Sequence, residues 1–465
     1  MVELGLWHYV GIIATLSLVA GVGIYAGKHV KNNHDFIAGG ARAGSISVAG
    51  SLLGVLMGGS ATVGTAQLGF TNGLSGIWFA LGSAMGCILY VLVYAIPLRH
   101  SGCTTLQQVI TKEYGKTAGM ISSIMGVVVI FFSLAPQMLS AIALIGSLFS
   151  VSNLMCAVIT ISLILSMVLF GGASGTGSVG TIKTILLYIA ACGGGLLAFY
   201  LVGGPSVLVV SLPAEPYFNL TSRGFGIDFG GGMAVAVGGV MASQSYVPCV
   251  LSARDDKTAK RGIWLAALLL LPIGIGGTVI GMFMKTVAPD MISKQAFPQF
   301  ALQNMPGLLA GVVLAGLMIA IMGTASGVVL AIGTIISQDV FRTIKKDASD
   351  NACLLANRIA IIVALVVALL LVAGDSDTPI ISWSYLAVAL RAAQSALPLT
   401  MALFMPGKFD KRFVIASIFI SPLLTLIAAK MFSLPFDSIF VALPVSGAIM
   451  AGGYIKNRQR QKNLL

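Results

Sequence analysis

Few side chains in the apolar segments of this chain are able to do chemistry, and their types exclude most reactions. All 15 Asp and Glu residues fall in polar stretches between the apolar runs, so paired-carboxylate catalysis, a carboxylate proton relay and an acidic cation filter lack their essential groups. The 6 cysteines form no CxxC pair and no Cys/His cluster, which argues against zinc and against a disulfide framework. We therefore expect neither an enzyme nor an organic cofactor. Two cations, Lys183 and Arg391, do lie inside apolar runs.

Polar side chains and glycines occur together in two short apolar segments. These are GVLMGGSATVG at 54–64 and GGVMASQSYVP at 238–248. Most of the 56 glycines are expected to serve close helix packing, although a glycine costs about 1 kcal/mol relative to alanine inside a helix. In membranes such clusters also mark deliberate helix breaks, where backbone and side-chain polar groups meet near mid-depth. We therefore expect a broken helix at each cluster.

The elements that must hold these residues are membrane-spanning helices. With 57% hydrophobic and 9% charged residues, against about 25% charged in soluble chains, a soluble fold is excluded. A helix needs about 20 apolar residues to cross the bilayer core, and the runs here are continuous rather than alternating, which excludes a β-barrel. The first run lacks the basic segment and the cleavage site of a signal peptide. Thirteen spans are expected, at 5–26, 44–70, 74–98, 118–147, 152–170, 176–202, 229–251, 262–284, 307–338, 353–373, 379–405, 413–431 and 438–455.

The positions of the basic residues set the expected orientation, because Lys and Arg accumulate in cytoplasmic loops. With the N-terminus outside, 21 of the 27 Lys and Arg residues fall in cytoplasmic segments, 4 fall in extracellular ones and two lie within spans. The net charge of +12 is thus mostly a topology signal, and we expect a lipid bilayer rather than a nucleic acid as partner. The prediction is a multi-pass protein of the cell membrane with its C-terminus in the cytoplasm.

The two broken helices are the second and the seventh span, so they stand five helices apart. An odd number of helices per repeat inverts the second copy. Helices 2–6 and 7–11 are therefore expected to form two inverted repeats with a site at the breaks, as in secondary transporters. The expected parts are an N-terminal helix and loop (1–43), the first repeat (44–203), an extracellular loop (204–228), the second repeat (229–405) and two C-terminal helices with a basic tail (406–465).

A small polar solute is the expected ligand at the breaks. Arg391 lies near the middle of its span, where a charge costs about 2.5–3.5 kcal/mol and usually marks a functional site, so we expect it to hold an anionic group such as a carboxylate. The alternative is that Arg391 pairs with helix carbonyls or with a loop acid such as Asp228 and only stabilises the bundle. The other candidates are Ser60, Ala61, Gln137, Ser243, Gln244, Tyr246 and Gln394. The polar side chains among them are equally suited to interhelical hydrogen bonds, worth about 0.6 kcal/mol each.

Several motifs carry a resemblance to a known family. They are HDFIAGGARAG at 34–44, SATVGTAQLGFTNGLSGIWFAL at 60–81, TTLQQVITKEYG at 104–115, SARDDKTAKRG at 252–262 and IAIMGTASGVVLAIGTIISQDVF at 319–341. In this order they resemble segments of the sodium:solute symporter family, which includes sodium/proline, sodium/sugar and sodium/sialic-acid symporters. The resemblance implies an all-α LeuT-type fold with two five-helix inverted repeats, preceded by one helix and followed by two. It also implies sodium-coupled symport.

The resemblance assigns a sodium site residue by residue. The family's ligands are carbonyls at the second-helix break and a carbonyl with two hydroxyls on the ninth helix, and they align with Gly54, Met57, Ala320, Gly323 and Thr324. Uncharged oxygen ligands suit Na⁺, but Gly323 brings no hydroxyl. Ser326 aligns with a position that lines an additional sodium site in some members. The alternative for the Thr324 and Ser326 hydroxyls is a bond to the carbonyl four residues earlier.

Lys183 departs from the family pattern. The segment SVGTIKTILL at 178–187 places Lys183 where many sodium-coupled members carry an aspartate of the additional sodium site. A fixed cation there repels Na⁺, by roughly 4 kcal/mol for two unit charges ~4 Å apart at an effective dielectric of about 20. Its long stem is able to reach Thr324 and Ser326 and to take the place of a bound ion. The alternative is that Lys183 snorkels to the cytoplasmic interface.

Together these features predict sodium-coupled symport of a small, polar, anionic solute by alternating access, with at most one Na⁺ per cycle. The alternative is a proton-coupled or sodium-independent transporter of the same fold, in which Lys183 replaces a bound cation. Pro248 and Cys249 stand where the family often has a Gln-Arg pair. The resemblance therefore does not name the solute, and neither it nor the composition predicts an oligomeric state.

Overall fold

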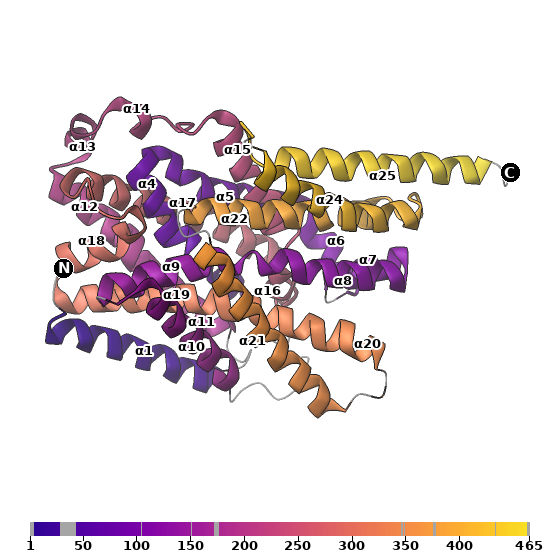
Figure 1. The fold of residues 1–465 in the computed structure, drawn as a ribbon, viewed down its shortest axis with the longest axis horizontal. Helices are drawn as coiled ribbons and strands as arrows, with labels where there is room; N and C mark the ends of the chain where they lie inside the picture. Colours follow the sequence, from indigo (N-terminus) through magenta and orange to yellow (C-terminus); the bar gives the residue numbers. More distant parts are fainter. Residues whose placement is uncertain are drawn as a thin grey trace.

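The computed structural model of the protein describes residues 4–27, 43–103, 105–149, 151–171, 176–345, 347, 349–374, 378–432 and 434–462. Within these residues every regular element is a helix, apart from one isolated bridge between Ala43 and Ala253. Lys28 and most of the motif at 34–44 lie outside the described residues. Long helices run side by side through the bundle (Figure 1), which confirms the expected all-α architecture.

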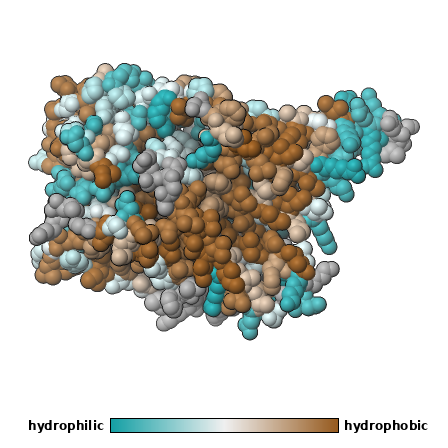
Figure 2. Space-filling model, viewed as in Figure 1, coloured by the Kyte–Doolittle hydropathy of each residue, from teal (hydrophilic) through white to brown (hydrophobic). Residues whose placement is uncertain are grey.

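A broad apolar belt covers the middle of the bundle, and hydrophilic residues gather at its two ends (Figure 2). On such a surface Leu92, Leu196 and Leu370 are 68%, 71% and 66% exposed, which suits contact with lipid rather than water. Among the described residues, nine helices are long and apolar enough to cross a membrane, or ten if one bent pair counts as a span. Three more apolar helices are shorter, at Leu6–Val22, Ser45–Leu56 and Asn153–Ser166. The number thirteen therefore stays a prediction.

The first predicted helix break is present. Helix α3 (Ser45–Leu56) ends at Met57, whose φ and ψ of −90° and 87° leave the helical region. After Gly58 and Gly59 the chain resumes as a π-helical turn, η2 (Ser60–Gly64), followed by α4 (Thr65–Asn72). At Gly73, φ is +58° and a Cβ would collide with Tyr217, so only glycine suits this turn. The chain then continues through η3 (Gly73–Ile77), α5 (Trp78–Leu89), η4 (Tyr90–Tyr94) and α6 (Ala95–His100).

The second predicted break is present as well. Helix α15 (Phe225–Ala234) continues as η6 (Val235–Met241), and beyond Ser243 the chain resumes as η7 (Gln244–Tyr246) and α16 (Val247–Leu251). The two halves are bent by 52°. Pro248 lies in the first turn of α16, where its missing N–H costs no helical hydrogen bond.

One expected span contains a joint between two helical segments, although Lys116–Leu148 as a whole is long and apolar enough to be one membrane span. The run 118–147 is divided into α8 (Lys116–Phe131) and α9 (Leu134–Leu148). Pro136 has no N–H for the carbonyl of Phe132 four residues earlier, and its ring crowds that carbonyl. An uninterrupted apolar run does not reveal such a break. Ser133 lies at this joint and takes part in the site described below.

The other elements include the remaining expected spans, several of them longer than expected. Helix α17 begins six residues before the expected span because the Asp255 side chain caps it, accepting a 2.7 Å hydrogen bond from the Thr258 N–H. The elements are α1 (Leu6–Gly27), α7 (Leu106–Tyr114), α10 (Asn153–Gly171), α11 (Thr176–Leu187), η5 (Tyr188–Gly193), α12 (Gly194–Val202), α13 (Pro205–Ser211), α14 (Ala214–Tyr217), α17 (Asp256–Val287), η8 (Ser293–Gln295), α18 (Ala296–Asn304), α19 (Gly307–Thr334), η9 (Ile335–Phe341), α20 (Arg342–Ile344), α21 (Asp350–Gly374), α22 (Ile380–Arg391), η10 (Ala392–Ala396), α23 (Leu397–Phe404), α24 (Lys411–Met431) and α25 (Ile439–Lys462).

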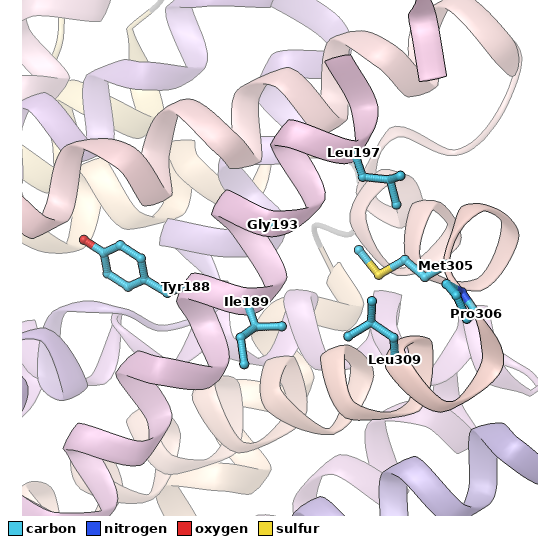
Figure 3. A pocket seen from close by; sticks show the side chains of 7 residues that line it. All are labelled: Tyr188, Ile189, Gly193, Leu197, Met305, Pro306 and Leu309. Carbon is cyan, nitrogen blue, oxygen red and sulfur yellow. The ribbon is translucent and has the colours of Figure 1, made fainter. Parts of the chain in front are cut away.

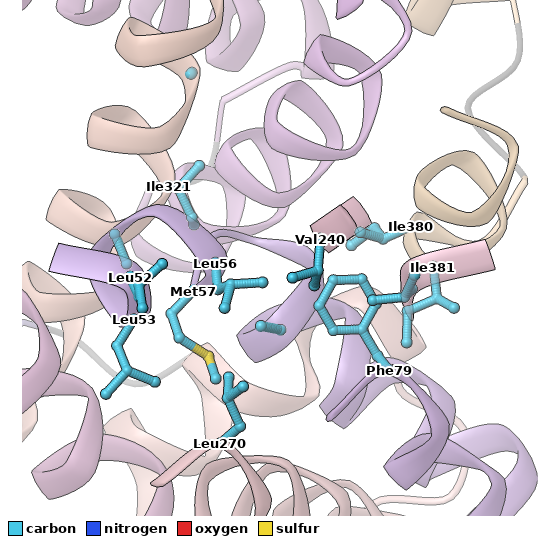
Figure 4. Packing of buried hydrophobic residues seen from close by; sticks show 14 of the residues in the cluster. Leu52, Leu53, Leu56, Met57, Phe79, Val240, Leu270, Ile321, Ile380 and Ile381 are labelled. Atoms are coloured by element: carbon cyan, nitrogen blue, oxygen red, sulfur yellow. The ribbon is translucent and has the colours of Figure 1, made fainter. Parts of the chain in front are cut away.

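The buried core surrounds the first break. Met57 at the end of α3 is 1% exposed, and it lies among Leu270 of α17, Ile321 of α19, Val240 of η6 and Phe79 of α5 (Figure 4). Helix α17 packs against α3, α4 and α5 together. Both halves of the first broken helix are therefore held by the same long helix.

Candidate solute and cation sites

Polar groups of neighbouring helices fill the first break. Gln137 of α9 accepts a 2.9 Å hydrogen bond from the Gly59 N–H through Oε1. Ser60 Oγ is hydrogen-bonded to Ser384 Oγ of α22, and Ala61 is buried beside it. Gln137 thus satisfies one of the amide groups that the start of a helix leaves without a partner.

Lys183 of α11 also lies at the first break. Its Nζ donates to the Gly54 carbonyl at 2.7 Å and to Thr324 Oγ1 at 2.9 Å. The residue is only 4% exposed, so its ammonium group is not at the cytoplasmic interface. It contacts two of the five positions that align with sodium ligands.

Close packing of α3 and α11 brings Lys183 to that carbonyl. A Cβ at Gly54 would lie 2.7 Å from the Cα of Gly180, so only glycine allows the two backbones to approach this closely. The Gly58 N–H, which a continuous helix would direct to the Gly54 carbonyl, bonds instead to the Leu56 carbonyl. The free carbonyl and the negative end of the α3 dipole both favour a cation here.

The other aligned sodium positions lie on α19 and at the end of α3. Thr324 Oγ1 donates to the Ala320 carbonyl at 2.9 Å. At Gly323 a side chain would meet open space, and Ser326 Oγ is buried without a hydrogen-bond partner among the described residues. Carbonyls and a hydroxyl without a carboxylate fit a monovalent cation such as Na⁺. In this structure the ammonium of Lys183 supplies that charge.

Arg391 lies at the second break. Its Nη1 donates to Ser243 Oγ at 3.2 Å, and its Nη2 donates to Ser133 Oγ at 2.8 Å. Its Nε is buried without a hydrogen-bond partner in the described part of the chain. None of the ion pairs among the described residues includes Arg391. Asp228, the loop acid considered as its partner, pairs instead with Arg223 at 2.6 Å.

The remaining candidate side chains have other partners or are simply buried. Gln244 Oε1 accepts a 2.7 Å hydrogen bond from the Leu106 N–H at the start of α7. Gln394 Nε2 donates to the carbonyl and the hydroxyl of Ser122 on α8, both at 3.0 Å. Tyr246 is 4% exposed. The structure thus brings Arg391 together with Ser243 but directs Gln244 and Gln394 elsewhere. Sequence reasoning missed Ser133, whose only signal is its position three residues before Pro136.

Comparison with known proteins shows the family and the fold of the chain. A profile of the sodium:solute symporter family matches residues 36–418, which is most of the chain. The chain belongs to the sodium:solute symporter family. The symporter fold is similar to that of a Na⁺-coupled sialic acid symporter in a substrate-bound outward-open state, with a TM-score of 0.78 at 18% identity over 98% of each chain.

More distant likenesses extend to other transporter families. A nucleobase-cation-symport-1 family transporter in a closed conformation gives a TM-score of 0.58 at 13% identity, over 90% of this chain and 94% of that one. A manganese transporter of Eremococcus coleocola gives 0.51 at 16% identity, over 94% and 98%. These likenesses confirm the LeuT-type fold of this family member.

Polar contacts link neighbouring elements on the side of the symporter that carries the expected extracellular loops, and we call this set of contacts the closure. Ser75 Oγ donates to Asp228 Oδ1 at 2.6 Å, and the guanidinium of Arg223 lies 5.6 Å from the ring centroid of Tyr385 on α22. Gln67 Oε1 of α4 accepts a 3.0 Å hydrogen bond from the Ile380 N–H. On the opposite side of the break Gly54 and Thr324 are half-buried.

Two hollows lie away from the breaks. The larger, of about 560 Å³, is lined by apolar side chains of η5, α12 and the start of α19, among them Ile189, Leu197 and Leu309 (Figure 3). Ile189 and Leu309 are 41% and 38% exposed, so this hollow opens to the lipid-facing surface. The smaller, of about 350 Å³, includes His100 and Lys112 at the ends of α6 and α7. Neither hollow includes a predicted solute or sodium residue of this symporter.

Proposed function

We propose that the protein is a secondary active transporter that moves a small, polar, anionic solute across the cell membrane by alternating access between its two repeats, 44–203 and 229–405. The observation that carries the proposal is that the Arg391 guanidinium is buried and has no counter-ion among the described residues. Its guanidinium lies at a helix break, has a buried Nε without a hydrogen-bond partner among the described residues, and joins none of the ion pairs found there. A buried charge without a counter-ion is costly, and an anionic solute would supply the missing charge.

The groups around Arg391 suit a carboxylate. A guanidinium binds a carboxylate through two parallel hydrogen bonds. Ser133 and Ser243 accept hydrogen bonds from Arg391, so each hydroxyl keeps its own O–H to donate to a solute. Because these serines belong to different repeats, a solute bound by all three residues would contact both. We propose that Ser60, Ala61 and Tyr246 at the breaks complete the pocket. The three glutamines, Gln137, Gln244 and Gln394, orient the helices around it.

The family supports Na⁺ as the co-transported ion, and we propose at most one Na⁺ per cycle. Its ligands would be Gly54, Met57, Ala320, Gly323 and Thr324, with Ser326 beside them. A second candidate is a proton-coupled or sodium-independent transporter in which Lys183 replaces the bound cation. The hydrogen bonds from Lys183 Nζ to Gly54 and Thr324 favour this second candidate. We propose no organic cofactor in either case.

Ligand screening followed by transport measurements tests the proposal. Small carboxylates and their neutral amides are compared by thermal shift of the purified protein in NaCl and in choline chloride, and the best ligand is then followed into proteoliposomes. We expect the carboxylate to stabilise the protein and its amide not to. Preference for the amide would contradict the anionic solute. Loss of uptake when choline replaces Na⁺ at constant pH supports sodium coupling, whereas retained uptake supports the second candidate. A Hill slope near two for the dependence of uptake on Na⁺ contradicts the limit of one Na⁺ per cycle.

A further inference from the structure

We propose that Lys183 and Na⁺ compete for one site. The ammonium group acts as a tethered cation that occupies the ion's place at the first helix break, and Na⁺ enters only when Lys183 swings away or is removed. This inference rests on the cation site proposed above. It concerns ion binding alone, so it stands or falls separately from the anionic solute.

The contacts of Lys183 make its ammonium and a metal ion mutually exclusive. Nζ lies 2.7 Å from the Gly54 carbonyl oxygen and 2.9 Å from Thr324 Oγ1, the distances of charge-assisted hydrogen bonds. A second cation on the same two oxygens would lie within a few ångströms of the first, and like charges repel strongly where water is scarce. None of the ion pairs among the described residues brings a carboxylate to Lys183 that would relieve this repulsion.

Arg391 repeats the arrangement at the second break. Lys183 belongs to the fifth helix of the first repeat. It donates to the Gly54 carbonyl near the end of α3, the first half of that repeat's broken helix, and to Thr324 on the third helix of the second repeat. Arg391 belongs to the fifth helix of the second repeat. It bonds to Ser243 at that repeat's break and to Ser133, at the joint of the first repeat's third span. Each repeat therefore places one cation at its own helix break.

The packing around the two cations repeats as well. Three residues before Lys183, the backbone of Gly180 contacts Gly54 of α3. Three residues before Arg391, the carbonyl of Val388 lies where a Cβ of Gly238 would be. Each cation thus follows a close backbone contact and reaches the C-terminal end of the first half-helix, where the helix dipole favours positive charge. At the first break the Lys183 ammonium therefore supplies the positive charge that the free helix carbonyl favours, a role that a bound Na⁺ would otherwise have.

Sodium titration of variants tests the competition. The full chain is purified in detergent, and its unfolding temperature is measured as Na⁺ replaces K⁺ at constant ionic strength and without solute. We expect Lys183→Ala to bind Na⁺ at least ten-fold more tightly than the wild type, or to gain a Na⁺ response that the wild type lacks. The double variant Lys183→Ala with Thr324→Val should lose that gain, because it lacks the hydroxyl ligand. Lys257→Ala, which removes an exposed lysine, should respond as the wild type does.

Several outcomes overturn the proposal. A Na⁺ response of Lys183→Ala equal to or weaker than that of the wild type contradicts it, as does a gain that survives Thr324→Val. If Lys183→Ala folds in Na⁺ but not in K⁺, that result supports competition. If it folds in neither, Lys183→Asp replaces the cation with a carboxylate, and absence of Na⁺ stabilisation in that variant also contradicts the proposal. In the same samples, the change in unfolding temperature on adding a carboxylate reports separately on the proposed solute binding.

Discussion

At the residue scale, the two intramembrane cations, Lys183 and Arg391, differ in whether a buried N–H donor is left without an acceptor. Lys183 directs its ammonium to a free helix carbonyl and a hydroxyl, which are groups of the fold itself. Arg391 also bonds to hydroxyls, but its Nε is buried without a partner among the described residues. An unsatisfied buried donor is costly, and a ligand able to accept its hydrogen bond removes that cost. Of the two cations, Arg391 is therefore the one prepared for a solute.

Replacement of Arg391 by glutamine should weaken solute binding much more than folding. Loss of a charged hydrogen-bond pair reduces affinity by about 10- to 100-fold, whereas glutamine removes only the charge and keeps an uncharged polar side chain that leaves no buried charge unpaired. The affinity of the best carboxylate is measured by thermal shift in wild type and Arg391→Gln, with the unfolding temperature without ligand as the folding control. Unchanged affinity in a well-folded variant would reject a direct role for Arg391.

The close approach of α3 and α11 predicts a position-specific cost of a single methyl group. Because a Cβ at Gly54 would lie 2.7 Å from the Gly180 Cα, Gly54→Ala should destabilise the protein by about 1–3 kcal/mol. Gly193, where nothing lies within 4 Å of an added Cβ, is the matched control. Gly193→Ala should be neutral or stabilising by up to about 1 kcal/mol. Thermal unfolding of both variants in detergent checks the contrast, and equal effects would contradict the packing.

Residue types indicated where to look but not which atoms meet. The depth of Arg391 and the absence of carboxylates could be read from the sequence. Its contact with Ser133 could not, because it depends on a joint between α8 and α9 that a continuous apolar run conceals. Gln244 and Gln394 were chosen for polarity near a break, and only packing directs them to Leu106 and Ser122. A side chain's partner is a property of helix rotation, which composition does not encode.

At the element scale, the closure on the expected extracellular side joins helices α4, α15 and α22 to the loop that carries Arg223. The loop between α24 and α25 joins this closure, because the Asp437 N–H donates to the Gly226 carbonyl at 3.0 Å. The Asp437 carboxylate accepts a 2.9 Å hydrogen bond from the Ile439 N–H at the start of α25. Burial nevertheless raises the pKa of Asp437 to about 6. The loop therefore packs best when this carboxyl group is protonated.

The raised pKa of Asp437 predicts pH-dependent stability of the closure. The folded protein binds a proton near pH 6, whereas an unfolded aspartate binds one only near about pH 4. The contribution to stability is therefore fully present below about pH 4 and is lost as the pH rises through about 6. Asp437→Asn should raise the unfolding temperature near neutral pH and flatten its change between about pH 4 and 7. Asp290→Asn, at an exposed position, is the control, and identical pH profiles for wild type and Asp437→Asn would contradict the prediction.

Element boundaries were predictable where local chemistry marks them. Clusters of glycine and polar residues predicted both helix breaks, at Met57–Gly59 and at Ala242–Ser243. The early start of α17 has a local signal as well, since Asp255 and Thr258 form a cap, but an apolar window does not score capping. The division of the fourth span follows from Pro136, whose effect on a carbonyl four residues earlier is invisible to a hydropathy pattern.

At the scale of the whole molecule, the sequence predicts the architecture because a few global constraints suffice. Apolar runs define spans, the spacing of the two breaks defines five-helix repeats, and the odd number per repeat defines inversion. The inverted-repeat architecture is predicted from these without any contact being known, and the resemblance to the family adds the LeuT-type fold. What they do not give is the conformational state. Closure at Ser75, Asp228 and Arg223 depends on a loop between the repeats, and its position is set by tertiary packing.

Membrane topology is a prediction for the whole molecule. It is tested by whether the number of crossings between two residues is odd or even. Between Glu215 and Lys257 lies one expected crossing, the second broken helix, whereas six lie between Lys257 and Arg458. Lys257 and Arg458 should therefore share the cytoplasmic face, with Glu215 opposite. Single cysteines at these three exposed positions, in a chain whose 6 native cysteines are replaced, are treated on intact cells with a membrane-impermeant thiol reagent. We expect labelling at 215 only, and labelling at 257 and 458 after permeabilisation. Because one missed or invented span between 257 and 458 would put them on opposite faces, labelling of only one of these two in intact cells would contradict the predicted topology.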